Sequence, residues 1–150
     1  MHHLDPILLV EDEPDAITLL QYAFARAGIR HPIHTVNDGE EAIAYLRGDG
    51  RYADRTAHPL PQFTLLDLKL PRCSGIEVIR WIRETPAVRA LPVIVLTSSK
   101  ERSDVRRAYA AGANSYLVKP SSLERLVEVA AAFRDYWLIH NEPAPRSGAE

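Results

Sequence analysis

The chain has 150 residues, of which 46% are apolar and 25% are charged, a composition typical of one globular domain with a substantial core. Its formal net charge of −2 gives no general attraction to nucleic acid or to an anionic membrane surface, so we expect neither as a partner. Because the chain has no apolar run of membrane-spanning length, no signal-peptide segment and a single cysteine, Cys73, we expect a cytoplasmic protein without a disulfide.

Short aliphatic runs alternate with segments of helical periodicity five times along the chain. The runs have the length and composition of buried strands, and the segments between them carry apolar residues at helical spacing. We expect strands at residues 7–10, 33–36, 63–66, 93–96 and 115–118. We expect helices at residues 14–27, 75–84, 103–111 and 123–139, and another that begins after residue 39. This alternation predicts an α/β fold, with a doubly wound parallel sheet covered by helices on both faces.

Two stretches fall outside the alternation. Residues 48–61 form a polar, proline-bearing connection, which we interpret as an insertion between a helix and the next strand. Residues 140–150 are rich in proline and small polar residues, and we expect them to be a disordered tail. We therefore expect one domain at residues 5–139 and no output domain, so that any output must come from contacts with other proteins.

Polar side chains follow four of the predicted strands at their carboxyl ends. Glu11 and Asp12 follow the first strand, Asp67 the third, Thr97 the fourth and Lys119 the fifth. In a doubly wound fold the carboxyl ends of the strands meet at one edge of the sheet, where ligands bind. Asp67 alone would be interpreted as a turn or helix-capping residue, since such aspartates are common after core strands. The convergence of the whole set indicates a functional site instead.

The charges at this edge predict the chemistry of the site. Glu11, Asp12 and Asp67 carry negative charge against the single positive charge of Lys119, so the cluster is repulsive unless protons or a cation are added. A site that offers only oxygen ligands, few of them from the protein, leaves room for several waters and suits Mg²⁺. The lack of a His or Cys cluster argues against zinc. Carboxylates, a magnesium ion, a hydroxyl and a lysine together are typical of a phosphoryl-transfer site, in which an aspartate can act as the covalent acceptor.

Four segments resemble the signature blocks of bacterial response-regulator receiver domains. They are ILLVEDEP at residues 7–14, LLDLKLPRCSG at residues 65–75, LTSS at residues 96–99 and YLVKP at residues 116–120. The resemblance extends over nearly the whole of the predicted domain. It implies a flavodoxin-like, CheY-like receiver whose five strands follow the order 2-1-3-4-5. It also implies a phosphorelay protein that is not an enzyme in the usual sense, but catalyses its own phosphoryl transfer and its own dephosphorylation.

The resemblance assigns roles to the acidic residues. Asp67 would accept a phosphoryl group from a sensor histidine kinase. Asp12 and Asp67, with the main-chain carbonyl of Lys69, would bind Mg²⁺, and Glu11 would act on the metal mostly through water.

The resemblance also assigns roles on the other side of the site. Thr97 and Lys119 would hold the phosphoryl oxygens. Tyr116 matches the aromatic residue that swings inward when Thr97 is drawn towards the phosphate. The peptide bond between Lys119 and Pro120 is expected to be cis.

The insertion and the C-terminal sequence resemble one subgroup of receivers. Residues 48–61 and the ending DYWLIHNEPAP at residues 135–145 resemble single-domain regulators that are paired with bacterial and cyanobacterial phytochromes. This resemblance implies a bacteriophytochrome as the partner kinase. The chain departs from the subgroup at Cys73, where many members have methionine, and in a slightly shortened loop after Thr97.

The last predicted helix suggests self-association. Its final four residues are aromatic or aliphatic, and consecutive residues point in different directions around a helix. Exposed aromatics near a helix end favour an interface, so we expect a twofold homodimer that uses Tyr136, Trp137 and Leu138. The alternative is that Trp137 and Leu138 fold back under the sheet while Tyr136 stays partly exposed.

Three other functions share parts of this pattern. A flavin-binding flavodoxin-like protein needs a phosphate loop rich in small residues after the first strand, where this chain has acids. A phosphatase of the haloacid dehalogenase type needs a second aspartate two residues after the nucleophile, where Lys69 stands. A pseudo-receiver, an interaction module that is never phosphorylated, is the remaining alternative, and the intact set of Asp12, Asp67, Thr97 and Lys119 argues against it.

Overall fold

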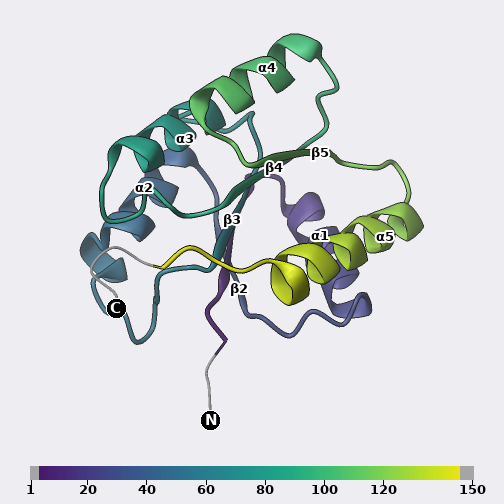
Figure 1. The fold of residues 1–150 in the computed structure, drawn as a ribbon, viewed down its shortest axis with the longest axis horizontal. Coiled ribbons are helices and arrows are strands. Elements are labelled where there is room, and N and C mark those ends of the chain that lie inside the picture. Colours follow the sequence, from purple (N-terminus) through teal and green to yellow (C-terminus); the bar gives the residue numbers. More distant parts are fainter. Residues whose placement is uncertain (1–3, 146–150) are drawn as a thin grey trace.

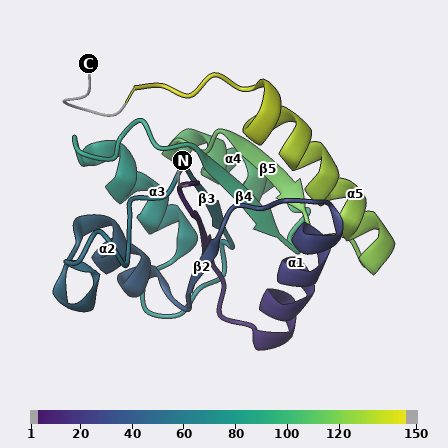
Figure 2. The same ribbon diagram turned by 90° about the horizontal axis from the view of Figure 1, so that it is seen from below.

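The computed structural model describes residues 4–145, and over this part of the chain it forms a five-stranded parallel sheet between two layers of helices (Figures 1 and 2). The strands are β1 (Ile7–Val10), β2 (Ile33–Val36), β3 (Phe63–Leu66), β4 (Val93–Thr97) and β5 (Ser115–Val118). Their order is β2-β1-β3-β4-β5. The predicted α/β fold and its strand order are therefore confirmed.

The helices lie close to their predicted positions. They are α1 (Pro14–Arg26), α2 (Gly39–Arg47), α3 (Gly75–Glu84), α4 (Arg102–Ala111) and α5 (Leu123–Phe133), with a short 3₁₀ helix η1 (Gly50–Tyr52) and a π-helix η2 (Arg134–His140). Their starts follow from local chemistry. Pro14 opens α1, and the side chains of Asp38, Ser74 and Ser122 accept hydrogen bonds from the first turns of α2, α3 and α5. Within the described residues, no helix is both long and apolar enough to cross a membrane.

The central strands are fully buried because helices cover both faces of the sheet. Every residue of β1, β3 and β4 is buried, whereas the edge strands β2 and β5 are partly exposed. Main-chain hydrogen bonds continue the ladder past the strand ends, from Asp67 N to the Val10 carbonyl (3.1 Å) and from Lys119 N to the Thr97 carbonyl (2.8 Å). The residues that follow the strands are thus held in register at the carboxyl edge.

The two faces of the sheet bury separate clusters of apolar side chains in the described part of the chain. One cluster lies beneath α2, α3 and α4 and includes Tyr45, Ile79 and Ala108. The other lies beneath α1 and α5 and includes Phe24 and Phe133. Figure 2 shows α2 and α3 on one side of the strands and α1 and α5 on the other.

The C-terminal helix differs from its prediction. It is α-helical only to Phe133 and continues as a π-helix to His140, closed by a 2.6 Å hydrogen bond from Asn141 N to the Tyr136 carbonyl. The Trp137 ring packs on Phe63 with their centroids 5.7 Å apart. Trp137 and Leu138 are therefore partly buried against their own domain, as in the alternative considered above.

The exposed residues of this helix are different ones. Tyr136 is 56% exposed and Ile139 is 62% exposed. Of the three residues expected at an interface, only Tyr136 presents a largely free side chain. The predicted tail at residues 140–150 begins one residue late, because His140 is still helical; residues 141–145 have no regular structure, and residues 146–150 lie outside the described residues.

Candidate functional site

The Asp67 carboxylate lies at the centre of the carboxyl edge of the sheet and accepts three hydrogen bonds. Thr97 Oγ1 donates to Asp67 Oδ1 (2.7 Å), and Lys69 N donates to the same oxygen (3.3 Å). Lys119 Nζ contacts the other oxygen, Oδ2, at 3.2 Å. The ends of β3, β4 and β5 therefore bring a carboxylate, a hydroxyl and an ammonium group together, as the sequence predicts.

Glu11 is almost completely buried, with 1% of its surface exposed, and both of its carboxylate oxygens have partners. Oε1 pairs with Lys119 Nζ, and Oε2 accepts a hydrogen bond from Glu13 N at 3.1 Å. In this structure Glu11 serves as the counter-charge of Lys119, and its action on a metal through water stays a prediction. Burial by itself would lower the pKa of Lys119, but hydrogen bonds and charge from Glu11 and Asp67 raise it above its ordinary value.

Asp12 differs from Glu11 in being exposed. Its carboxylate has neither a hydrogen bond nor an ion pair with any other described residue. Across residues 4–145, no three His, Cys, Asp or Glu side chains lie close enough to one another to hold a metal ion. The side chains that stay candidates for holding a metal are those of Asp12 and Asp67, with the Lys69 carbonyl in the same loop as Asp67. Two carboxylates and one carbonyl fit a hard cation that keeps several waters, which is the coordination that Mg²⁺ prefers.

The loop that carries Asp67 is packed tightly against its neighbours, which explains the glycines around it. A Cβ atom on Gly75 would lie 2.5 Å from the Asp67 carbonyl oxygen and 2.7 Å from Leu68 Cα. A Cβ atom on Gly39 would lie 2.0 Å from the Cys73 carbonyl oxygen. Both positions need glycine because the neighbouring atoms belong to the backbone, which cannot move aside as a flexible side chain could.

One prediction about the site is wrong. The Lys119–Pro120 bond is trans, and there is no cis peptide bond anywhere in the described residues. For a bond that precedes proline, the trans isomer is the more stable one by about 0.5–1 kcal/mol. With this bond trans, Lys119 already contacts both Glu11 and Asp67, so the site is assembled without the cis isomer.

Comparison with known protein families agrees with this geometry. The family model of the response regulator receiver domain matches residues 7–131 of this chain. The chain belongs to the response regulator receiver family. It is therefore a two-component phosphorelay protein, a role that the convergence of Asp67, Thr97 and Lys119 fits.

Individual relatives resemble this receiver over most of their length. The probable methanogenesis regulatory protein FilR2 of Methanothrix harundinacea is 43% identical over 143 residues, which are 93% of this chain and 88% of that protein. Response regulator Rcp1 of Synechocystis is 36% identical over 132 residues, 88% of each chain. The crystal structure of the Mn²⁺-bound form of Rcp1 has a TM-score of 0.82, with 34% identity and coverage of 93% of this chain and 99% of that chain. The crystal structure of the phosphorylated cyanobacterial phytochrome response regulator RcpA has a TM-score of 0.86, with 36% identity and coverage of 93% and 98%.

Tyr116 of the receiver lies beside the site in a half-buried position. Its hydroxyl donates a 2.9 Å hydrogen bond to the main-chain carbonyl of Ser99, in the loop that follows Thr97. The Ser99 hydroxyl in turn contacts Asp104 Oδ2 at 2.5 Å, which connects this loop to α4. Burial raises the pKa of Tyr116 above its ordinary value. The contact between Tyr116 and the loop after β4 is where an aromatic switch would act, and the movement itself stays a prediction.

Sequence reasoning missed the residues that surround the site. In the sequence, Asn37 and Asp38 indicate only a turn and a helix cap, and Glu41 and Ser99 are not among the predicted site residues. The cap itself is foreseeable because aspartate is a preferred residue at the start of a helix. In the structure Asp38 accepts a hydrogen bond from Glu41 N. The reach of Asn37 to the Glu11 carbonyl is not foreseeable, because the two residues are 26 positions apart in sequence.

Proposed function

We propose that this receiver accepts a phosphoryl group on Asp67 from a sensor histidine kinase in the cytoplasm. Asp12, Asp67 and the Lys69 carbonyl would hold the Mg²⁺ ion that this transfer needs. The observation that supports the proposal most is the arrangement around Asp67, in which Thr97 and Lys119 contact different oxygens of one carboxylate. A pseudo-receiver has no need of this arrangement.

The chain's own groups account for most of the chemistry. An oxygen of the Asp67 carboxylate attacks the phosphorus, and the phosphorus–nitrogen bond to the kinase histidine breaks as the new phosphorus–oxygen bond forms. Lys119, kept cationic by Glu11, and the Thr97 hydroxyl then contact the phosphoryl oxygens and stabilise the charge on them. A bound Mg²⁺ ion would neutralise further negative charge on the transferring group.

The proposed kinase is a bacteriophytochrome. This is supported by the similarity to RcpA, a cyanobacterial phytochrome response regulator, over 93% of this chain. The similarity to FilR2, a probable methanogenesis regulatory protein, makes the alternative a kinase with a different input. Phosphoryl transfer from a purified bacteriophytochrome to this receiver, compared with transfer from an unrelated sensor kinase, decides between them. Equal rates from the two kinases would contradict the phytochrome assignment.

We further propose that the receiver forms a homodimer through the C-terminal helix. The support is the exposure of Tyr136 and Ile139 on η2, with Trp137 packed beneath them on Phe63. Analytical ultracentrifugation at micromolar concentration, with and without phosphorylation, tests the dimer. Tyr136→Ala should dissociate it without loss of folding, whereas a monomer under all conditions would contradict the proposal.

Mass spectrometry after treatment with acetyl phosphate and Mg²⁺ tests the phosphorylation itself. The wild-type protein should gain one phosphoryl group, and Asp67→Asn should gain none. Asp12→Ala should lose both metal binding and phosphorylation, because it removes one of two carboxylate ligands. Phosphorylation of another residue in the intact protein would overturn the assignment of Asp67, and no phosphorylation at all would favour the pseudo-receiver.

A further inference from the structure

We infer that Asn37, in the turn between β2 and α2, is a positioning residue for the metal ligand Asp12, and that Glu41 and Tyr52 hold Asn37 in place. Through this connection the insertion at residues 48–61 would influence the affinity of the site for its metal. The inference rests on the proposed function, because it concerns the same Mg²⁺ site.

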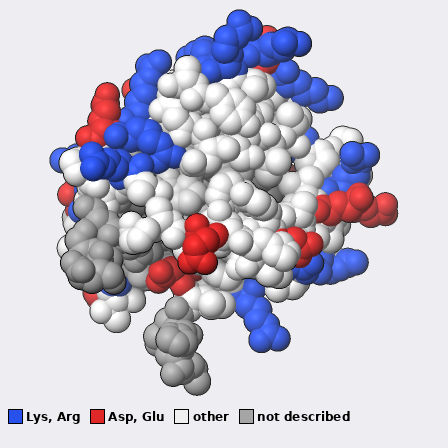
Figure 3. Space-filling model, in the orientation of Figure 1, with Lys and Arg blue, Asp and Glu red and all other residues white. Residues whose placement is uncertain are grey.

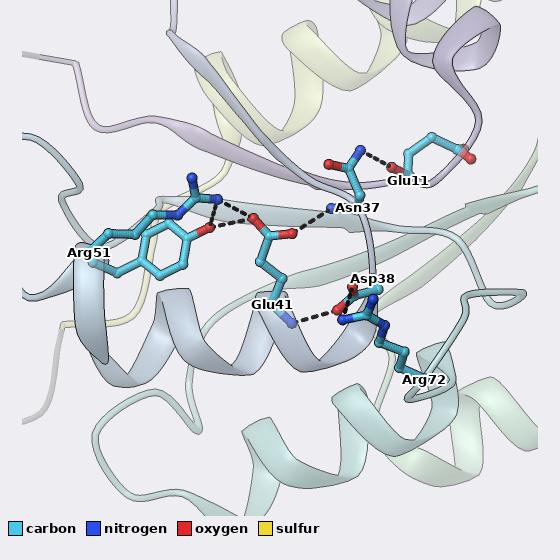
Figure 4. A network of polar contacts seen from close by, with 7 residues as sticks. Glu11, Asn37, Asp38, Glu41, Arg51 and Arg72 are labelled. Atoms are coloured by element: carbon cyan, nitrogen blue, oxygen red, sulfur yellow. Dashed lines mark hydrogen bonds and ion pairs between the residues drawn. The ribbon is translucent and has the colours of Figure 1, made fainter.

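The first contact joins the turn to the loop that carries Asp12. Asn37 Nδ2 donates a hydrogen bond to the main-chain carbonyl of Glu11 at 3.4 Å (Figure 4). This carbonyl belongs to the peptide group that links Glu11 to Asp12. The Asp12 carboxylate has no partner of its own among the described residues, so its position depends on the backbone that carries it. Asn37 restrains that backbone on one side of Asp12, and the Glu11 side chain, which accepts a hydrogen bond from Glu13 N, restrains it on the other.

The second contact fixes Asn37. Glu41 Oε2 accepts a hydrogen bond from Asn37 N at 3.4 Å, while Glu41 N donates to Asp38 Oδ1 at 2.7 Å. In an ordinary capping box, the glutamate three residues into a helix bonds to the N–H of the cap residue itself. Here its carboxylate reaches one residue further back, to the residue whose side chain contacts the Glu11 carbonyl.

The third contact comes from the insertion. The Tyr52 hydroxyl donates to Glu41 Oε1 at 2.5 Å. Arg51 pairs with the same oxygen (Figure 4). Arg51 is 70% exposed, so its contribution is screened by solvent. Tyr52 is 5% exposed, and its ring packs on Tyr45 with a centroid distance of 5.0 Å. Tyr52 is therefore the rigid member of the pair and the stronger restraint on Glu41.

The same turn also contacts the loop that bears the other ligands. Arg72 NH1 lies 3.7 Å from Asp38 Oδ2, and Arg72 is three residues beyond Lys69 (Figure 4). Among the described residues, Arg72 is the only residue other than glycine with a positive φ, at 69°. The turn at Asn37 and Asp38 thus lies between the two loops that supply the metal ligands and contacts both.

The expected effect is on metal affinity. Groups that orient metal ligands typically change affinity by about 10–100-fold when they are removed. Asn37 acts on the backbone beside Asp12 rather than on its carboxylate, so we expect the lower end of this range, about tenfold, for Asn37→Ala. Glu41→Gln and Tyr52→Phe should weaken affinity progressively less, because each lies one contact further from the site.

Isothermal titration calorimetry with Mg²⁺, and with Mn²⁺ as a second probe, measures this affinity without phosphorylation. Tyr45→Phe is the matched control, because it removes a buried hydroxyl of the same aromatic cluster, bonded to the Pro59 carbonyl, without touching Glu41. Thermal unfolding of the metal-free proteins establishes that each variant is folded. Tyr52→Phe is the mildest change and keeps the test valid if Asn37→Ala does not fold.

The outcomes separate this inference from the proposed function. Weaker metal binding in Tyr52→Phe and Glu41→Gln, with unchanged binding in Tyr45→Phe, supports the inference. Wild-type affinity in all the folded variants overturns it and leaves the proposed function standing. Equal weakening in Tyr45→Phe and Tyr52→Phe overturns it in favour of a general loosening of the insertion. If the wild-type protein binds neither metal, both the inference and the proposed metal site are wrong.

Discussion

The two faces of the sheet both bury apolar clusters, and they differ in the contacts that supplement this packing. Beneath α1 and α5, aromatic rings pack in a chain: Phe24 stacks on Phe133 with centroids 5.8 Å apart, and Phe63 meets Phe133 edge-on at 5.8 Å. Beneath α2 and α3, partly buried guanidinium groups bond to several main-chain carbonyls, whereas the α1 and α5 side has the bond from Arg134 to the Ala27 carbonyl. Arg55 contacts three carbonyls around the end of α2, and Arg83 contacts three carbonyls and the Asn114 side chain.

This difference separates two tasks. Apolar contacts stabilise in proportion to the area they bury and fix no particular loop geometry. Hydrogen bonds to specific carbonyls fix where loops lie, and the network of Glu41 and Asn37, which reaches the site, lies on the α2 side (Figure 4). In Figure 3, Lys and Arg side chains gather along the top over α4, while Asp and Glu side chains lie just below the centre of this view. We therefore expect changes on the two faces to affect stability and metal affinity differently.

The largest effect on stability is expected from Phe133→Ala. Phe133 is 4% exposed and contacts two other rings, so its truncation should lower the free energy of unfolding by about 3–5 kcal/mol. Urea denaturation measures this loss. Titration calorimetry of the folded variant should give wild-type Mg²⁺ affinity, and weaker binding would show that the aromatic face also positions the site.

A smaller loss is expected from Arg83→Met. This change keeps most of the apolar volume but leaves the carbonyls of Gly112, Arg89 and Leu91 without their donor, which should cost about 2–3 kcal/mol in urea denaturation. Arg80→Met is the matched control on the same helix. Because Arg80 is exposed, its replacement should change stability by no more than about 0.5 kcal/mol. Equal losses from the two would show that the carbonyl contacts of Arg83 contribute nothing.

The contrast between the faces also explains which features the sequence predicts. The strands are predictable because burial on both faces requires continuous aliphatic runs, as at Ile7–Val10. The convergence of Asp67, Thr97 and Lys119 then follows, because parallel strands present their carboxyl ends at one edge. These features depend on local composition and on a general rule of topology, and both are visible in one sequence.

The long-range polar contacts were not predictable, because the residues that they join are distant in sequence. Arg83 stands in the last turn of its helix, where a basic residue is ordinarily explained by the helix dipole, yet its partner Asn114 lies 31 positions away. The change from α-helix to π-helix after Phe133 has no signal in the apolar pattern. The trans bond at Pro120 contradicts an expectation taken from the family resemblance, and nothing in the local sequence selects either isomer.

The pH dependence of stability should come from the α2 and α3 side of the sheet, first through Glu41. Burial by itself would raise the pKa of Glu41, but hydrogen bonds from Tyr52, Asn37 N and Arg51 lower it below its ordinary value of 4.5. A carboxyl group whose folded pKa is lowered stabilises the fold above its unfolded pKa, and this stabilisation is lost as the pH falls through the folded value.

The matching experiment compares Glu41→Gln with the wild type across pH. The variant should be less stable by about 1–2 kcal/mol at pH 7, which is the range for hydrogen bonds to a charged group after partial screening by solvent. The difference should shrink below pH 4.5. In Phe133→Ala the loss of stability should be the same at pH 7 and below pH 4.5. A Glu41→Gln difference that is also independent of pH would remove this distinction between the faces.

The smallest effect is expected at His34, on the edge strand β2, whose ring contacts Tyr45 of α2. The Tyr45 hydroxyl has one proton and donates it to the Pro59 carbonyl (2.9 Å), so His34 Nδ1 must donate to the Tyr45 oxygen (2.8 Å). Burial, and then the charge of His58, lowers the pKa of His34 below 6.5. A base whose folded pKa is lowered contributes its full stability above the unfolded pKa of 6.5 and loses it as the pH falls towards the folded value. Because the ring is partly exposed and screened, the loss should be less than about 1 kcal/mol. Chemical denaturation at pH 7.5 and pH 5.5 should show the wild type losing more stability than His34→Gln, and equal losses would show that His34 titrates alike in the folded and unfolded chain.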